Sequence, residues 1–203
     1  ERVEDLIPMT EIELKVEFNA IVSRHEQADT AASAMRQIRR RETLRIAMGA
    51  VLSDLTLDQI SQALSDLTAC YVRGMLDVVV ELDGSSVSHD KPLEILDFGI
   101  IAMGRFGGEE LGFGSDADVM FVYEPHPGII PELAQKTAER IISDLKLFAA
   151  DPLLEFELDL DLRPEGKNGP NARSLDSYRA YYERWADTWE SQALLRAKPI
   201  AGS

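Results

Sequence analysis

The sequence has little that could crosslink it or anchor it in a membrane. Cys70 is its only cysteine, so no internal disulfide can form, and a reducing cytoplasm suits the chain. The apolar, helical surroundings of Cys70 favour a small buried hydrophobe over a nucleophile. No apolar run is long enough to span a bilayer, and no signal-peptide pattern opens the chain. We therefore expect a cytoplasmic protein with no membrane partner.

Positive charge is also scarce. The chain has 21 Lys and Arg residues against 36 Asp and Glu residues, a formal net charge of −15. Non-specific nucleic-acid binding depends on Lys and Arg that neutralise phosphates, so this balance argues against a nucleic-acid partner. The length of 203 residues allows one sizeable core with a helical appendage.

Proline and glycine are nearly absent from the first part of the chain. Between residues 11 and 82 there is no proline, and the only glycines are Gly49 and Gly74. Apolar residues recur there at helical spacing, which predicts about three helices. Thr56 and Gln59 have the spacing of a capping box at the start of one of them. We expect a linker over residues 1–10 and a helical unit over 11–90.

Residues 91–203 show a change of period and form a second predicted region, with a small mixed sheet and C-terminal helices. The whole chain is therefore expected to be α+β. Trp185, Trp189 and the tyrosines between 178 and 182 are helically spaced and are predicted to be core. Because the chain begins at Glu1 without Met and stops after an apparent helix, we expect an excised piece of a longer protein. The predicted elements are strands at 96–103, 119–123 and 155–162, and helices at 131–150, from Ser174 onward and at about 188–198.

Acidic residues are concentrated where chemistry is expected. A glycine-rich loop starting at Gly104 runs into Asp116-Ala-Asp118, and the segment 155–162 alternates acid and hydrophobe. Side chains two apart on a strand share a face, so Asp116 and Asp118 are predicted to point the same way. Like charges on one face are destabilising unless something neutralises them. A divalent metal is the natural candidate, and the pattern indicates metal-assisted phosphoryl or nucleotidyl transfer.

The same loop offers groups for phosphate. Ser115 and the amides of Gly107, Gly108 and Gly114 could hydrogen-bond phosphate oxygens, because glycine lets the backbone approach closely. Arg105 could supply positive charge to the same oxygens. A third carboxylate, from the later acidic strand, would complete the metal shell.

Each part also has a plainer interpretation. A lone Asp-x-Asp is usually solvated acid, Gly-Gly is a turn, and an acidic alternating strand is a half-exposed edge. Five arginines between residues 36 and 45 favour a solvated helix face with local ion pairs. The combination of the loop, the acid pair and the acidic strand is much more specific than any of these alone.

The quoted residues resemble a known family. Gly104, eleven residues and Asp116-x-Asp118 form the pattern of the polymerase-β-type nucleotidyltransferase superfamily. The run from Met103 to Asp118, the segment Asp159-Leu-Asp-Leu-Arg163-Pro and the run from Trp189 to Pro199 resemble the glutamine-synthetase adenylyltransferase family. The family often has Arg where Asp161 stands, and Lys where Arg105 stands.

This resemblance implies a nucleotidyltransferase fold and a site. Asp116 and Asp118 match the metal-binding pair and Asp159 the third carboxylate, with Mg²⁺ or Mn²⁺ as the metal and ATP as the substrate. Gly104, Arg105, Gly107, Gly108 and Ser115 belong to the matching loop. The resemblance also points to Arg163, Lys167 and Lys198 as ATP contacts.

The family's activity comes in two halves. One domain moves AMP from ATP to a tyrosine of glutamine synthetase, and a related domain removes the AMP by phosphorolysis. The resemblance also implies a signalling protein that acts through the rest of the full-length chain and links the enzyme to nitrogen metabolism. The ending and the Gly-Ser-Asp-Ala-Asp run favour the C-terminal, adenylylating domain. The removing half, and a catalytically silent nucleotide-binding regulatory module, remain the alternatives.

Overall fold

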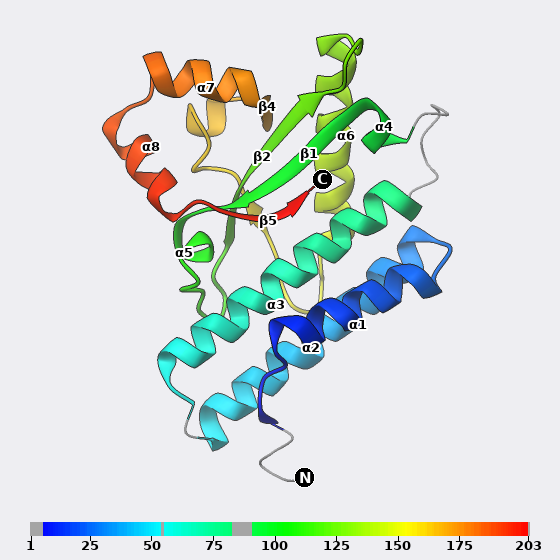
Figure 1. Ribbon diagram of the computed structural model, residues 1–203. Coiled ribbons are helices and arrows are strands. Elements are labelled where there is room, and N and C mark those ends of the chain that lie inside the picture. Colours follow the sequence, from blue (N-terminus) through cyan, green and yellow to red (C-terminus); the bar gives the residue numbers. More distant parts are fainter. Residues whose placement is uncertain (1–5, 54, 83–90, 203) are drawn as a thin grey trace.

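The computed structural model describes residues 6–53, 55–82 and 91–202. Figure 1 shows a layer of long helices beside a small sheet, with two short helices on the sheet's other side. The helices are α1 (Glu11–Arg24), α2 (Ala28–Leu52), α3 (Leu57–Asp77), α4 (Pro92–Ile95), α5 (Gly104–Gly107), α6 (Pro131–Ala149), α7 (Leu175–Arg184) and α8 (Thr188–Ala193). The strands are β1 (Leu96–Ala102), β2 (Ala117–Pro125), β3 (Leu158–Asp159), β4 (Ala172–Ser174) and β5 (Lys198–Gly202). A π-helical turn follows α3 at Val78–Leu82, and short 3₁₀ helices lie at Gly166–Asn168 and Leu194–Arg196.

The three long N-terminal helices confirm the prediction from periodicity. Capping boxes start α1 and α3: Thr10 pairs with Glu13 and Thr56 with Gln59, each satisfying otherwise unpaired N–H groups of the first turn. Cys70 is 3% exposed on α3, as expected of a small buried hydrophobe. None of the described helices is long and apolar enough to cross a membrane.

The sheet is mixed, as predicted. Its order is β3-β2-β1-β5, and β4 pairs with β2 further along the same edge as β3. β1 lies antiparallel to both β2 and β5, whereas β3 and β4 run parallel to β2. The parallel pairing places Asp118 directly opposite Asp159.

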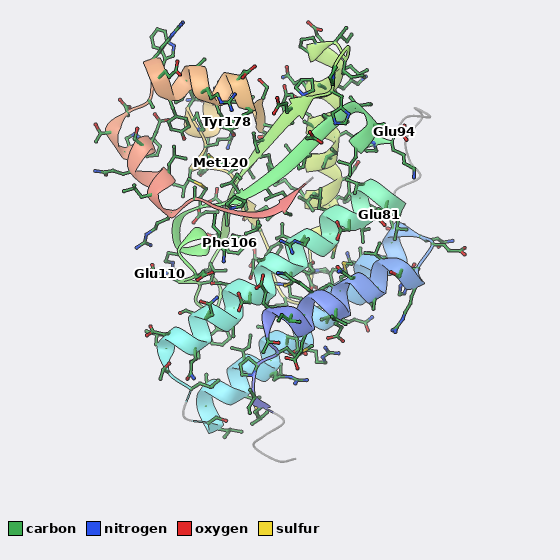
Figure 2. The ribbon with its side chains drawn as sticks, viewed as in Figure 1. Glu81, Glu94, Phe106, Glu110, Met120 and Tyr178 are labelled. Carbon is green, nitrogen blue, oxygen red and sulfur yellow. The ribbon has the colours of Figure 1, made fainter. Side chains whose placement is uncertain are left out.

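The two faces of the sheet are covered by different helices. Phe98 and Phe121 belong to one large core that also contains side chains of α1, α2, α3 and α6. Met103 and Met120 form a separate cluster with Tyr178 of α7, and Figure 2 labels Met120 and Tyr178. One core thus spans the predicted helical unit and the sheet region. The division near residue 90 falls at residues 83–90, outside the described ranges, and stays a prediction.

Two predicted elements are wrong in extent. The acidic segment 155–162 forms a regular strand only at Leu158–Asp159. The strand ends there because the Asp161 amide donates to Oδ1 of Asp159 at 2.7 Å and the chain turns. The last helix ends earlier than predicted, and Lys198–Gly202 forms the edge strand β5.

The predicted aromatic core on the C-terminal helices is only partly correct. Tyr178 is 8% exposed, but Trp185 is 74% exposed and Trp189 48% exposed. Trp185 is the C-cap of α7, so it no longer follows the helical period that carries Tyr178 inward. The two tryptophans are therefore surface residues.

Candidate active site

The glycine-rich loop begins with a close approach between backbone and carboxylate. Gly104 has φ +52°, a left-handed conformation that side chains disfavour. A Cβ at this position would lie 2.4 Å from Oδ2 of Asp118. Gly104 therefore allows the one-turn helix α5 to sit directly against an acid of β2.

The acids that meet at this point come from β2 and β3. Asp118 and Asp159 are a register pair on neighbouring parallel strands, and Asp116 lies just before β2 begins. Burial raises the pKa of Asp118, and the negative charges of Asp159 and Asp116 raise it further. Arg105 opposes the increase only in part. The sheet thus gathers carboxylates whose mutual repulsion a cation would relieve.

Arg105 and Ser115 also come together, as the sequence predicts. The Arg105 guanidinium donates a short hydrogen bond to the Ser115 hydroxyl, which accepts a second one from the Gly112 amide at 3.0 Å. This places a positive charge and a hydroxyl at the entrance of β2, beside Asp116.

The predicted role of two glycines is not supported by this geometry. The Gly107 amide donates to the Met103 carbonyl at 2.7 Å, and the Gly108 amide donates to the Gly104 carbonyl at 3.1 Å. A Cβ on Gly107 would lie 1.9 Å from the Arg196 carbonyl oxygen. These two glycines allow close packing of α5, and their amides already have partners within the chain.

The basic residues proposed to contact ATP have different positions. Arg163 is 7% exposed, and its guanidinium donates to the carbonyls of Leu160 and Gly169, so it holds its own loop together. Lys198, the first residue of β5, forms an ion pair with Glu109, which follows α5. The structure therefore does not bring Arg163 or Lys198 to the acid pair.

Lys167 is the basic residue of that set that stays beside the acidic strand. Its ammonium lies 3.2 Å from Oδ2 of Asp161, and its side chain is 80% exposed. It partly balances the charge of Asp161, the acid that stands where the family often has Arg.

A cleft of about 260 Å³ opens beside the loop, between α2 and α3 on one side and residues 111–116 and 154–157 on the other. Ser115 and Asp116 are at its wall, which is mostly apolar. Among the described residues that line it, the positively charged side chain is Arg39, whose guanidinium already donates hydrogen bonds to the carbonyls of Leu154 and Glu155. Three acids, Asp116, Glu155 and Glu157, also line it, so this cleft is unfavourable for a phosphate.

The carboxylates of this site resemble the open ligand set of a magnesium ion more than a site in which protein side chains supply every ligand. Within residues 6–53, 55–82 and 91–202, no three His, Cys, Asp or Glu side chains form a ready-made metal cluster. Mg²⁺ usually takes one or two protein carboxylates and completes its shell with water and substrate phosphates. Asp118 and Asp159, adjacent and mutually repelling, match that incomplete set.

The fold and the site together define the class. A small mixed sheet with a one-turn helix between its first two strands, and an acid pair across β2 and β3, is an α+β nucleotidyltransferase-type fold. The chain matches the family described as glutamate-ammonia ligase adenylyltransferase over residues 4–203 and belongs to it. The family resemblance read from the sequence motifs is confirmed.

Curated relatives agree over nearly the whole chain. The bifunctional glutamine synthetase adenylyltransferase/adenylyl-removing enzyme of Leifsonia xyli is 46% identical over 202 residues, which is 100% of this chain and 19% of the relative. The proteins of the same name from Cutibacterium acnes and Mycobacterium tuberculosis are 43% and 44% identical, over 98% and 90% of this chain. The chain spans about a fifth of the length of these relatives.

Proposed function

We propose that this chain transfers AMP from ATP to a tyrosine side chain of glutamine synthetase. The observation that supports this most directly is the register pair Asp118–Asp159 at the end of a glycine-rich loop. Membership of the family supports the reaction class, and the relatives' names supply the protein substrate. Regulation by a signalling protein through further parts of a longer chain remains a prediction.

Each residue has a role in this proposal. Asp118 and Asp159 would hold Mg²⁺, with Asp116 beside them, and the ion would neutralise charge on the phosphates. Arg105 and Ser115 orient phosphate oxygens at the start of β2. The tyrosine oxygen bonds to the α-phosphorus as the bond to pyrophosphate breaks, and its proton passes to a carboxylate of the pair.

The test uses α-labelled ATP, Mg²⁺ and unmodified glutamine synthetase with the 203-residue chain. Label should appear on the synthetase with the wild-type chain and fall at least about 1000-fold with Asp118→Asn, since the acid pair is central to charge stabilisation. Asp176→Asn is the matched control, because this exposed acid at the start of α7 forms its ion pair with Arg179 of the same helix. Equal labelling by wild type and Asp118→Asn would refute the assignment of the site.

The removal of AMP is the second candidate, because the relatives' names carry both activities. In that reaction an oxygen of inorganic phosphate bonds to the phosphorus of the AMP–tyrosine ester, the bond from phosphorus to the tyrosine oxygen breaks, and ADP and the free tyrosine hydroxyl are the products. Release of ADP from pre-adenylylated synthetase plus phosphate, without labelling from ATP, would assign this half instead. Nucleotide binding with neither reaction would favour a silent regulatory module.

A further inference from the structure

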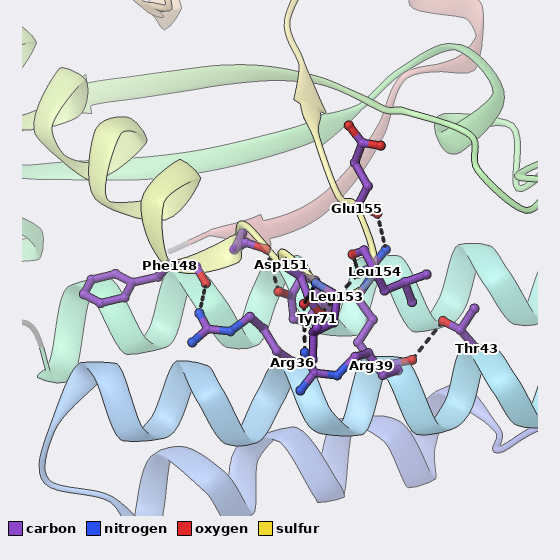
Figure 3. Close-up of polar contacts among 11 residues, drawn as sticks. Arg36, Arg39, Thr43, Tyr71, Phe148, Asp151, Leu153, Leu154 and Glu155 are labelled. Atoms are coloured by element: carbon purple, nitrogen blue, oxygen red, sulfur yellow. Dashed lines mark hydrogen bonds and ion pairs between the residues drawn. The ribbon is translucent and has the colours of Figure 1, made fainter.

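The segment between α6 and β3 has no regular secondary structure, so its carbonyl groups need partners from elsewhere. Figure 3 shows that α2 supplies them. Arg36 donates to the carbonyl of Phe148, in the last turn of α6, at 2.7 Å, and Arg40 forms an ion pair with the buried side chain of Asp151, just after that helix, at 2.8 Å. The prediction that these arginines form a solvated helix face is wrong for them, since they bind a segment more than 100 residues away.

Arg39 makes the most extensive of these contacts. Its guanidinium donates to the Leu154 carbonyl at 2.8 Å and to the Glu155 carbonyl at 3.0 Å. It lies 4.6 Å from the ring centre of Phe156 and 5.5 Å from that of Tyr71. Burial lowers the pKa of this guanidinium, and the side chain is only 11% exposed. A desolvated charge kept in this place must be well compensated.

The residues that Arg39 binds lead directly into the candidate site. Two residues after Glu155, the Glu157 carbonyl accepts a hydrogen bond from the Ala117 amide at 3.2 Å. The next two residues form β3, in which Asp159 pairs with Asp118. β3 is only two residues long, so few ladder hydrogen bonds set its register.

We propose that Arg39 is a positioning residue for the acid pair: by holding residues 154–156 it sets where β3 begins, and so where the Asp159 carboxylate lies opposite Asp118. This inference rests on the proposed function, because the proposed function is what assigns a metal ion to Asp118 and Asp159. It also gives α2 a part in the chemistry, although no atom of α2 is asked to touch the substrate.

Lysine is the informative replacement for Arg39. It keeps the positive charge, but its compact ammonium cannot present a planar fork to two carbonyls and stack on two rings. Arg39→Lys therefore changes geometry rather than net charge. Arg45→Lys is the matched control on the same helix, because Arg45 pairs locally with Glu42 at 3.1 Å and does not contact residues 154–156.

The primary measurement is Mn²⁺ affinity, followed by the electron paramagnetic resonance signal of free Mn²⁺ without any substrate. We expect Arg39→Lys to weaken binding about tenfold, as is typical when a residue that orients a metal ligand is changed. Arg45→Lys should bind as the wild type does. Wild-type affinity in Arg39→Lys would overturn the inference.

Thermal unfolding separates positioning from a merely structural role. A lower midpoint with unchanged Mn²⁺ affinity, measured well below that midpoint, would show that Arg39 only stabilises the fold and would overturn the inference. If Arg39→Lys does not fold, Phe156→Leu removes one ring under the guanidinium and keeps the two hydrogen bonds. It should weaken Mn²⁺ binding by a smaller factor, and an unchanged affinity there would count against the inference.

One further variant distinguishes a failure of the Arg39 inference from a failure of the proposed metal site. Asp118→Asn should abolish tight Mn²⁺ binding. If it leaves binding unchanged, the acid pair is not the metal site, and the proposed function fails together with the inference. If it abolishes binding while Arg39→Lys has no effect, only the inference fails.

Discussion

The hydroxyl of Tyr181 donates to the buried carboxylate of Glu190, whose two oxygens lie 2.9 and 3.1 Å away. The same carboxylate accepts the amides of Asp187 at 2.8 Å and Glu165 at 3.3 Å. Glu190 is 3% exposed. One side chain therefore ties together α7, α8 and the loop that follows the acidic strand.

Replacing Glu190 with alanine should destabilise this arrangement. Glu190→Ala leaves the Tyr181 hydroxyl and two amides without their acceptor, and a cost of about 3 kcal/mol in the free energy of unfolding is expected. Urea unfolding measures it. Glu183→Ala, at an exposed position of α7, should change stability by less than about 0.5 kcal/mol; a similar loss in both variants would contradict the prediction.

A methyl group on Gly104 should damage activity. Gly104→Ala places a Cβ against Oδ2 of Asp118 at a left-handed position, so the carboxylate must move. A displacement of about 1 Å at a reacting centre costs about 100-fold in rate, and label transfer to glutamine synthetase would measure it.

Gly128→Ala is the control for backbone strain. Gly128 has φ +87° but no atom within 4 Å of an added Cβ. This variant should lose about 1 kcal/mol of stability and keep its activity per folded molecule. Equal losses of activity in both variants would mean that strain, not the contact with Asp118, decides the result.

The stability of the protein should depend on the ionisation of Asp77. Burial raises the pKa of Asp77 to about 6, Glu81 adds to the increase and Arg73 opposes it. The folded state keeps a proton that the unfolded state, with a pKa near 3.8, releases earlier. This contribution to stability is therefore lost as pH rises from about 4 to 6.

Asp77→Asn removes this dependence. Relative to the wild type, the variant should gain about 2 kcal/mol between pH 4.5 and pH 8, measured by urea unfolding at the two pH values. Asp176→Asn, at an exposed acid, should show no such change. A constant difference between Asp77→Asn and the wild type would exclude a raised pKa.

Cys70 should be nearly inert in the folded protein. Burial raises the pKa of its thiol to about 11, and the thiolate is the reactive form. At pH 8 its reaction with a disulfide reagent should be about 100-fold slower than in denaturant. Fast reaction in the native protein would place the thiol at the surface.

Local signals in the sequence identified most of the helices correctly. The Thr56–Gln59 capping box, Pro131 at the start of α6 and Ser174 at the cap of α7 each act within a few residues, so their effect does not depend on the rest of the chain. The two central strands of the sheet, β1 and β2, were also predictable, because they are long and largely buried. Short strands were not: β4 and β5 have three and five residues and form only because β2 and β1 offer edges to pair with.

Side chains that act over long sequence distances were beyond the sequence. The arginine-rich stretch of α2 looked like a solvated face, yet Arg36 binds the last turn of α6, and Arg39 and Arg40 bind the segment after it. Arg163 looked like a phosphate ligand, yet it holds its own loop. A guanidinium has the same donors for a phosphate, a carbonyl or water, so only its neighbours decide its role.

The sequence by itself determined the family, the order of the main elements and the loop with its acids, because these depend on residue types at short spacings. Tertiary structure decided which acids meet. Asp118 and Asp159 are forty-one residues apart in the chain. They become neighbours because β3 pairs in parallel with β2 over two residues, which places Asp159 opposite Asp118. Neither residue type nor spacing specifies that register, because it is set by the packing and hydrogen bonds that hold residues 154–157 in place.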